Sequence, residues 1–435
     1  MMAEQMIQDT AGKAIPAGYQ QTEVGVIPHE WNVRKLKEIS PSQSVGLVIN
    51  PSSYYSSNGS IPMLVGSHVS ENKIFWSNAN KITEESNAKL PASRLNAGDL
   101  VTVRVGAPGI TAVVPIELDK ANCASMMIIR KSDSFDSQWL CYLMNSKHGK
   151  ACIEGVQYGT AQKQFNIIDA VEFLFPVPPK QEQTAIANVL SDSDALIGSL
   201  EQLIAKKQAI KSATMQQLLT GRIRLPQFAL RPDGTPKGYK TSELGQIPED
   251  WEVCELQDAV IFLDGQRRPI KSDERAKMAG GYPYYGASGI VGYVNDYIFD
   301  EDLILLGEDG ENILSRSVPL AFQVSGKIWV NNHAHVLRPQ NDFHIYFLTE
   351  YLESLDYSLF NSGTAQPKLN KKTCQRIKVI KPKYEEQTAI ATILSDMDSE
   401  LTALEQKLAK ARDVKQGMMQ QLLTGRIRLP LSKEA

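Results

Sequence analysis

Cysteine is scarce in this sequence, and its placement follows no pattern. Five cysteines are scattered over 435 residues, an odd number, and no two of them are spaced as CxxC. Disulfide frameworks and zinc sites need paired or clustered cysteines, so we expect neither, and the pattern is typical of a reducing, cytoplasmic protein. The five are Cys123, Cys141, Cys152, Cys254 and Cys374.

Long apolar runs are missing as well. No stretch approaches the ~18 uninterrupted apolar residues of a membrane-spanning helix, and residues 1–16 are too polar for a secretory signal. A net charge of −3 argues against a generic polycation, so a nucleic-acid partner would have to bind to local basic surface. Hydrophobic residues nevertheless make up 42% of the chain, which is enough for two sizeable cores.

The motifs of common nucleotide-binding and DNA-modifying enzymes are absent too. Adenine methyltransferases carry an [ND]PPY segment, but residues 176–180 (PVPPK) lack the acidic or amide residue that would hold the target amine. Residues 324–328 (VSGKI) lack the upstream glycine of a GxxxxGK[ST] phosphate loop. No HExxH motif or other His/Cys cluster with the spacing of metal ligands occurs. We therefore expect no catalytic residue, no metal site and no cofactor in this chain.

Two weaker alternatives stay open. His333 and His335 lie on one face of an expected strand, with His344 nearby, and could form a metal pair. Histidines that are hydrogen-bonded within a β-core, or that face DNA, explain the same pattern better. A nuclease site is the second alternative, although the lysine that it needs about two residues after a carboxylate is missing. Its candidate carboxylates are Asp99, Asp302, Glu308, Asp309 and Glu311.

The clearest feature that is present is an internal repeat. Residues 182–226 realign on residues 386–430 with a shift of 204 and no gap, and 28 of the 45 positions are identical. Two shorter motifs also recur: residues 18–31 at 238–251, with a shift of 220, and residues 159–166 at 363–370, with a shift of 204. The stretches between them show little likeness, and the second is 16 residues shorter. The repeated motifs form one framework that is used twice with two different variable regions. This organisation suits a protein that recognises a bipartite target.

The repeat predicts an α+β protein with pseudo-two-fold organisation. Short β-type runs at 100–105, 303–306 and 327–330 are broken by Gly, Pro, Asn and Ser, as in compact domains with many loops. The predicted segments are a tail (1–17), a first domain (18–179), a first long helix (180–226), a linker (227–237), a second domain (238–382), a second long helix (383–430) and a tail (431–435).

Each copy of the repeat ends in a long predicted helix. Two prolines (178–179) precede the first helix, and Gly221 and Gly425 stand where a C-terminal cap belongs. Apolar residues recur at alternating steps of four and three, a heptad stripe that Lys211 and Lys415 interrupt. Each helix could lie on its own domain, but two similar helices of ~55 Å favour an antiparallel pair. The predicted seam comprises Ile186, Leu190, Ile197, Leu200, Ile204, Leu218, Ile390, Leu394, Met397, Leu401, Leu404, Leu408, Met418 and Leu422.

Basic and polar clusters are the candidates for DNA contact. Residues 368–383 hold seven basic residues and no acid, which suits phosphate contacts, although a solvated strand edge is the alternative. Arg and Gln contact guanine and adenine edges, while Tyr, Gly and Ser allow close approach. Arg104 could instead belong to a buried structural pair. The predicted contacts are Ser67, His68, Arg104, Gln162, Lys163, Gln164, Gln266, Arg267, Arg268, Tyr284, Tyr285, Ser288, Gln366, Lys368, Lys371, Lys372 and Arg376.

Four repeated motifs, in this order, resemble the specificity subunit of type I restriction-modification systems. They are the opening GYxx[ST]ExGxIPxxW, the GTAQ(K/P)xxN element, the helix start EQxxIAxxLSxxD and the helix end LLTGRIRLP. Residues 282–301 (YPYYGASGIVGYVNDYIFDE), 305–313 (LLGEDGENI) and 331–339 (NNHAHVLRP) resemble one recurring type of target-recognition domain in that family. The likeness extends over residues 18–430 without a departure from the family layout.

The resemblance implies a non-catalytic DNA-reading subunit with two target-recognition domains separated by two antiparallel helices. It implies two modification subunits as partners, which hold S-adenosylmethionine and methylate adenine in double-stranded DNA. It also implies restriction motor-nuclease subunits, which use ATP and Mg²⁺. Each domain would read one half of an asymmetric, gapped sequence. A protein–protein adaptor without DNA readout of its own is the alternative. It does not explain why the two variable regions are polar and differ from each other.

Overall fold

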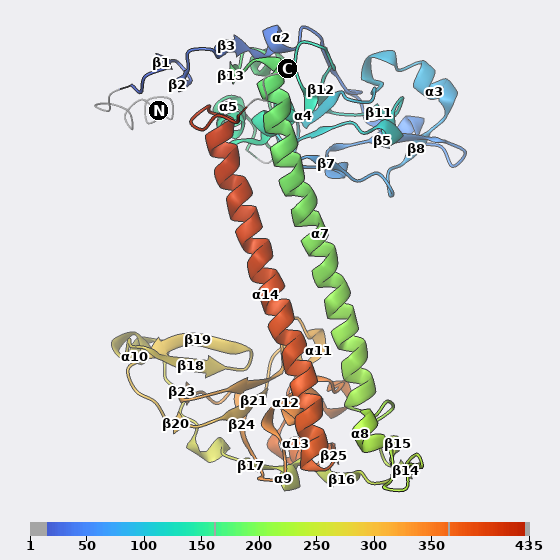
Figure 1. Ribbon diagram of the computed structural model, residues 1–435, viewed down its shortest axis with the longest axis vertical. Helices are drawn as coiled ribbons and strands as arrows, with labels where there is room; N and C mark the ends of the chain where they lie inside the picture. The colour runs from blue at the N-terminus through green and yellow to red at the C-terminus, as the bar shows by residue number, and fades with distance from the viewer. Residues whose placement is uncertain (1–14, 161, 364–365, 431–435) are drawn as a thin grey trace. The chain divides into compact units, whose positions relative to one another are not determined.

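The chain forms two compact units, and each unit combines a mixed α/β region with parts of two long helices. Unit 1 comprises Met1–Leu200 and Lys407–Ala435, and unit 2 comprises Glu201–Gln406. The structure is a computed structural model that describes residues 15–160, 162–363 and 366–430 (Figure 1). The predicted tail 431–435 and most of the predicted tail 1–17 lie outside these residues. The predicted α+β class is confirmed.

Unit 1 is built around a four-stranded sheet with the strand order β10-β9-β12-β4. A second sheet has the order β11-β5-β8. The strands are β1 (Tyr19–Thr22), β2 (Gly25–Pro28), β3 (Asn32–Lys35), β4 (Gln43–Val45), β5 (Ile61–Leu64), β6 (Val69–Ser70), β7 (Lys73–Ile74), β8 (Lys81–Ile82), β9 (Leu100–Val103), β10 (Thr111–Val113), β11 (Asn122–Cys123), β12 (Met126–Ile129) and β13 (Leu174–Val177). The helices are α2 (Leu36–Ile39), α3 (Glu84–Ala88), α4 (Ser137–Asn145), α5 (Lys147–Val156), α6 (Ile167–Ala170) and α7 (Lys180–Leu218).

Unit 2 contains two four-stranded sheets, with the orders β17-β24-β21-β22 and β19-β18-β23-β20. The strands are β14 (Tyr239–Ser242), β15 (Gly245–Pro248), β16 (Glu252–Glu255), β17 (Val260–Phe262), β18 (Tyr282–Gly286), β19 (Gly289–Val294), β20 (Phe299–Asp300), β21 (Leu303–Gly307), β22 (Ala321–Val324), β23 (Lys327–Val330), β24 (Ala334–Pro339) and β25 (Lys378–Lys381). The helices are α8 (Pro226–Ala229), α9 (Leu256–Ala259), α10 (Ser272–Lys277), α11 (Asn312–Ser315), α12 (Ile345–Glu353), α13 (Lys371–Gln375) and α14 (Tyr384–Leu422).

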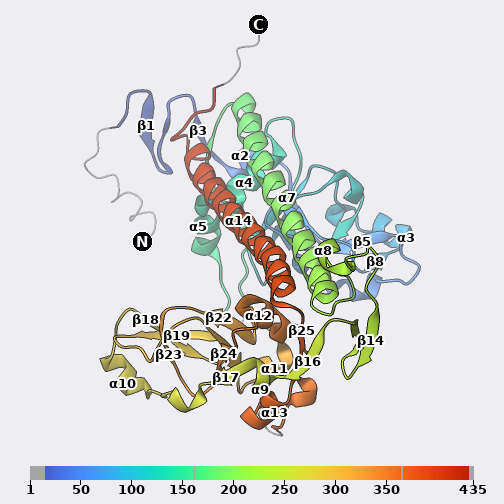
Figure 2. The same ribbon diagram turned by 60° about the horizontal axis from the view of Figure 1, so that its bottom comes forward.

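The central strand of each unit is buried on both faces. In unit 2, Leu303 and Leu305 of β21 belong to a core shared with the other sheet, whereas Ile304 and Leu306 belong to the core that contains α12. This alternation follows from the two-residue period of a strand. Helix α12 packs beside β22 of the same sheet (Figure 2). In unit 1, β9 is likewise buried on both faces. Leu100 belongs to the hydrophobic cluster that contains α4, and the next residue, Val101, belongs to a second cluster. A run of apolar residues without polar alternation is the sequence signature of such strands.

The two long helices are 39 residues each, Lys180–Leu218 and Tyr384–Leu422. In unit 1, Asp194 of α7 pairs with Lys415 of α14, and in unit 2, Lys211 pairs with Asp398. Because residues later in α7 pair with residues earlier in α14, the helix segments within each unit are antiparallel, as predicted.

The predicted apolar stripe is buried for most of its length. The residues at its ends pack into the domain cores as well as against the other helix. Only Met397, Leu404, Leu408 and Met418 of the predicted set are half-buried. Six of the others belong to the cores of the two α/β regions as well: Ile186, Leu190 and Leu422 in unit 1, and Leu218, Ile390 and Leu394 in unit 2. The prediction of a pure helix–helix seam is corrected to this extent. Each helix end is also an element of its domain core.

The repeated motifs meet at the helix ends, which explains why they recur together. Gly425 follows α14 with φ +70°, and a Cβ at this position would lie 2.5 Å from Cδ of Pro28 in the opening motif. Gly221 and Pro248 repeat this contact in unit 2, again at 2.5 Å. Only glycine accepts both the left-handed backbone and this close approach. The sequence therefore conserves the Gly–Pro pair in both copies.

A buried carboxylate ties each opening motif to the helices. The indole of Trp31 donates a hydrogen bond of 2.9 Å to Glu182, which also pairs with Arg428 beyond α14. In unit 2 the indole of Trp251 donates to Glu386 at 3.0 Å, and Arg224 lies 2.6 Å from the same carboxylate. Buried carboxylates are stable only when they are paired in this way.

Among the described residues, no helix is long and apolar enough to cross a membrane.

Candidate nucleic-acid interface

In unit 2, the GTAQ element docks on the end of the central strand β21. The backbone N–H of Leu369 donates to the carbonyl of Glu308 at 2.7 Å, and the N–H of Gly310 donates to the carbonyl of Pro367 at 3.1 Å. An isolated β-bridge joins Asp309 and Lys368. We call residues 307–310 together with 363 and 366–370 the GTAQ corner of unit 2.

Unit 1 has an equivalent GTAQ corner, formed by residues 104–106, 159–160 and 162–165. An isolated bridge joins Val105 and Gln164, which stand 204 positions before Asp309 and Lys368. The N–H of Gly106 donates to the carbonyl of Lys163 at 2.9 Å. The variable regions are therefore built on the same plan at this point. Arg104 of unit 1 and Glu308 of unit 2 occupy equivalent positions.

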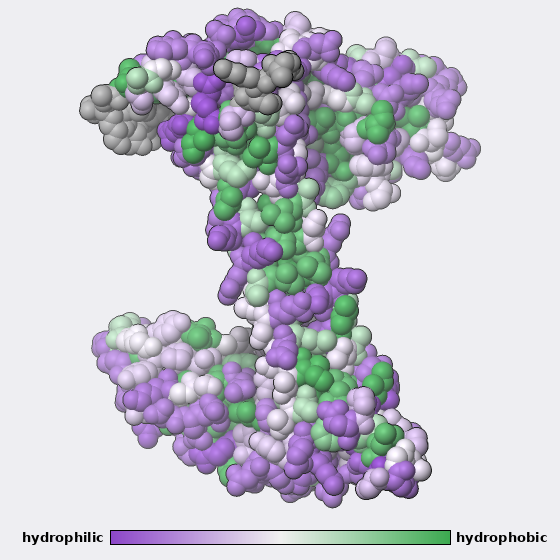
Figure 3. Space-filling view, viewed as in Figure 1, coloured by the Kyte–Doolittle hydropathy of each residue, from purple (hydrophilic) through white to green (hydrophobic). Residues whose placement is uncertain are grey.

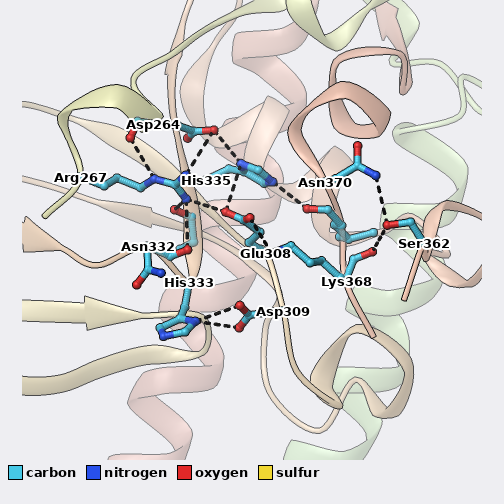
Figure 4. A network of polar contacts seen from close by, with 12 residues as sticks. Asp264, Arg267, Glu308, Asp309, Asn332, His333, His335, Ser362, Lys368 and Asn370 are labelled. Atoms are coloured by element: carbon cyan, nitrogen blue, oxygen red, sulfur yellow. Dashed lines mark hydrogen bonds and ion pairs between the residues drawn. The ribbon is translucent and has the colours of Figure 1, made fainter. Parts of the chain in front are cut away.

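A buried ion-pair network lies beneath the corner of unit 2 (Figure 4). His335 is 1% exposed; its Nδ1 lies 2.8 Å from Asp264, and its Nε2 donates to the carbonyl of Leu369 at 2.9 Å. Arg267 lies 2.7 Å from Glu308 and donates to the carbonyl of Ala334 at 2.8 Å. The network therefore holds the GTAQ element against β24 and the turn at Asp264.

The electrostatics of this network favour the charged forms of its members. Burial by itself lowers the pKa of His335, but its interactions with Asp264 and Cys374 outweigh burial and raise the pKa to about 10. Burial opposes ionisation of Asp264 and Glu308 as well, yet His335 and Arg267 hold the pKa values of these carboxyls below their usual range. His335 is therefore protonated at neutral pH and donates from both ring nitrogens.

The metal-pair alternative does not fit these contacts. A protonated His335 has no lone pair for a metal, and His333 is turned to Asp309, with 2.9 Å between nitrogen and oxygen. His344 caps α12. The described residues contain no group of three His, Cys, Asp or Glu side chains that could hold a metal ion. His335 is thus a hydrogen-bonded histidine of a β-core, as the preferred interpretation stated.

The nuclease alternative finds no support in the arrangement either. Asp99 belongs to unit 1 and pairs with Arg130 at 2.7 Å, while the other four carboxylates belong to unit 2. Within unit 2, Glu308 is engaged with Arg267, and Asp309 with His333.

Three predicted DNA contacts are corrected by their burial or their partners. His68 is 8% exposed, and its Nδ1 accepts the N–H of Val65 within the turn Gly66–His68. Tyr284 is 2% exposed, and its hydroxyl accepts the N–H of Ile270. Arg267 is held by Glu308 beneath the surface. His68 and Tyr284 are therefore buried inside their units, and Arg267 is engaged in an internal ion pair.

Other predicted contacts of unit 2 do lie on its surface around the GTAQ corner. The turn at 264–268, the β18–β19 hairpin and the turn at 331–333 are joined by backbone bonds, from Asn331 to Tyr285 at 3.0 Å and from Arg268 to Val330 at 3.2 Å. Tyr285 itself is half-buried. The exposed members of the predicted set in this region are Gln266, Arg268, Ser288, Gln366 and Lys368.

The basic run of unit 2 divides into paired and unpaired cations. Lys368 lies 3.4 Å from Glu308, and the Nζ of Lys371 lies 5.4 Å from the centre of the Phe262 ring. Lys372 and Arg376 have no ion-pair partner among the described residues. They line a surface hollow of about 300 Å³ together with Phe360, Asn370 and Thr373. Phe360 and Asn370 were not predicted from the sequence, because nothing in the residues around them indicates that they line the same hollow.

In unit 1, the predicted contacts are fewer and lie on two loops. Ser67 is exposed in the turn Gly66–His68, and Gln162 and Lys163 are exposed in the GTAQ element. The backbone of Gln164 pairs with Tyr158 at 2.8 and 2.9 Å. Arg104 is half-buried, and its Nε is buried without a hydrogen-bond partner.

Comparison with known proteins gives one consistent family. Residues 28–211 and 248–411 match the family described as "Type I restriction modification DNA specificity domain". The putative type I restriction enzyme MjaX specificity subunit of Methanocaldococcus jannaschii is 25% identical over 428 residues, covering 94% of this chain and 97% of the relative. A putative type I restriction enzyme specificity subunit of Haemophilus influenzae is 34% identical over 140 residues, 32% of this chain and 35% of that one.

A solved structure of similar fold supports the architecture. The crystal structure of the type I restriction-modification system S subunit from M. genitalium matches with a TM-score of 0.59 at 18% sequence identity. The match covers 90% of this chain and 96% of that one.

Proposed function

Because this chain belongs to the family of type I restriction-modification DNA specificity proteins, we propose that unit 1 and unit 2 each read one half of a bipartite, gapped target in double-stranded DNA. The chain is the specificity subunit of such a system and serves as its DNA-recognition component, not as its catalyst. The helices α7 and α14 set the length of the gap.

The observation that carries this proposal is the pair of equivalent GTAQ corners. The bridge between Val105 and Gln164 and the bridge between Asp309 and Lys368 give the same backbone arrangement. The side chains on the two corners differ in charge and size, from Arg104 in one to Glu308 in the other. An identical frame with different side chains is what reading two different sequences requires, since base identity is read by side chains.

The chain works together with the other subunits of the system. We propose two modification subunits, which bind S-adenosylmethionine and methylate adenine, and restriction subunits, which use ATP and Mg²⁺, all in the cytoplasm. Exposed apolar residues on the part of α7 in unit 2 support a docking surface: Leu203 and Ile210 are seven positions apart and are 39% and 41% exposed. Apolar side chains are visible along the helices in Figure 3. Such a stripe is unusual on a helix that faces only water.

Selection from random DNA tests the function. The full chain, co-expressed with its modification subunits, is incubated with a pool of random duplexes, and the retained fraction is sequenced. The expected result is two short conserved blocks separated by a spacer of fixed length. A pool without sequence preference, bound equally well by the modification subunits alone, would favour the adaptor alternative.

A further inference from the structure

Arg104 is a half-buried charged residue of the GTAQ corner of unit 1. It follows β9, continues the strand face of Leu100 and Thr102, and its carbonyl accepts the N–H of Phe165 at 3.3 Å. The side chain is half-buried, with Nε shielded from solvent and unbonded. No carboxylate of the described residues lies within ion-pair distance of it.

The buried Nε–H of Arg104 has no acceptor among the described residues, which is unfavourable in the free protein. Burying a charged N–H without an acceptor costs the full desolvation penalty, so buried arginines are normally paired. Arg130 of the same unit shows the normal arrangement, since its guanidinium bonds Asp99 and two backbone carbonyls. The buried-pair alternative for Arg104 is therefore not realised among the described residues.

The equivalent position in unit 2 is fully compensated. Glu308 has Arg267 at 2.7 Å and Lys368 at 3.4 Å, so this corner presents no unpaired charge. The difference indicates that the two corners are adapted to different tasks. In the corner of unit 1, by contrast, Arg104 has no ion-pair partner among the described residues, so its guanidinium can donate to an external acceptor.

We propose, resting on the function above, that Arg104 is a DNA-contacting residue of unit 1 whose guanidinium donates hydrogen bonds to DNA. Two acceptors share this chemistry: the O6 and N7 edge of a guanine, which the planar fork of arginine matches, and the oxygens of a phosphate. The exposed Gln162 and Lys163 of the same corner flank the position.

Three variants of the full chain test this in complex with the modification subunits: Arg104→Gln, Arg104→Lys, and Lys150→Gln as the control. Lys150 is an exposed lysine of unit 1 paired with Glu71, so its replacement removes the same charge away from the corner. The readouts are the methylated sequence in cells, affinity for the selected duplex, the salt dependence of that affinity, and thermal unfolding.

For a guanine contact, Arg104→Gln relaxes one position of the half-site read by unit 1 by about 10- to 100-fold, and the other half-site stays unchanged. For a phosphate contact, affinity falls for all sequences, and the salt slope decreases by about one unit. Arg104→Lys retains more of the phosphate contact than of the guanine contact.

The inference is overturned if both Arg104 variants keep the wild-type motif, affinity and salt slope. If Arg104→Gln fails to fold, Arg104→Met, which keeps the apolar stem but not the charge, takes its place: wild-type binding by this variant together with a wild-type motif would overturn the inference. If the wild-type complex itself shows no sequence preference, it is the proposed function that fails.

Discussion

The ammonium group of Lys211 lies 2.6 Å from the carboxylate of Asp398. The same contact recurs in unit 1, where Lys415 lies 2.5 Å from Asp194, and each partner is displaced by 204 positions. A tyrosine hydroxyl from the adjoining domain helix completes each pair, from Tyr142 to Asp194 at 2.8 Å and from Tyr346 to Asp398. The two lysines that interrupt the apolar stripe thus tie α7, α14 and the neighbouring domain together.

We predict that the Lys415–Asp194 pair contributes measurably to stability. The side chains are 15% and 24% exposed, so solvent screens them less than a surface pair. Replacing either residue by Ala should lower the free energy of unfolding by about 1–3 kcal/mol, with a coupling energy of about 1–2 kcal/mol in the double-mutant cycle. Urea unfolding measures both.

The matched control is the Lys207–Glu400 pair, whose side chains are 34% and 48% exposed. Its coupling energy should stay below about 1 kcal/mol. Equal coupling in the two cycles would contradict the role assigned to the Lys415–Asp194 pair.

Two glycines give a second prediction, in which one alanine substitution should lower the stability and the control substitution should raise it. Gly425→Ala places a Cβ at φ +70° and 2.5 Å from Pro28, so it should destabilise unit 1 by more than about 1 kcal/mol. Gly198→Ala adds a methyl group inside α7 with nothing within 4 Å, and should stabilise by roughly 0.5–1 kcal/mol. Thermal unfolding of the two variants distinguishes them. A destabilising Gly198→Ala would show that this helix position is not open.

The pH dependence of unit 2 should report His335. Its pKa is raised by folding to about 10, so the protonated ring stabilises the fold fully below its unfolded pKa of ~6.5. This stability is lost as the pH rises from there through about 10. Wild-type stability should therefore decline over this range. His335→Gln should be less stable at neutral pH and should show a smaller decline. Identical pH profiles for the two proteins would refute the buried ion pair with Asp264.

The basic residues of the run 368–383 should contribute to the affinity for DNA but not to sequence specificity, and their contributions should differ. Lys372 and Arg376 have no ion-pair partner in the described part of the chain, whereas Lys368 and Lys371 contact Glu308 and the Phe262 ring. Replacing Lys372 and Arg376 by Ala should weaken binding to all sequences and lower the salt slope by up to about two units. The double replacement of Lys368 and Lys371 should change the slope less. Equal slopes in all proteins would favour a solvated edge.

Much of the fold could be predicted from the sequence, because periodicity and repetition are local signals. The helix start at Lys180, the caps at Gly221 and Gly425, and the strand Leu303–Gly307 correspond closely to predicted segments. The antiparallel helix segments followed from two similar heptad stripes.

The candidate site was less predictable, because it depends on contacts distant in sequence. Nothing local distinguishes Arg267, which turns inward to Glu308, from the exposed Arg268 beside it. The burial of Tyr284 next to the half-buried Tyr285 depends on which strand face covers the core. The equivalence of Arg104 and Glu308 became visible only from the backbone bridges, since the surrounding residues share little beyond Gly106 and Gly310.

The most direct test of the account is an exchange of one recognition domain, read out by methylation. Residues 239–382 are replaced by the corresponding segment of another family member, and methylated adenines are mapped in cells that express the chain with its modification subunits. If each unit reads one half of the target, one half changes while the other half is retained. An unchanged target would contradict this expectation, because the chain would then not select the DNA sequence, and a change in both halves would contradict the assignment of one half to each unit.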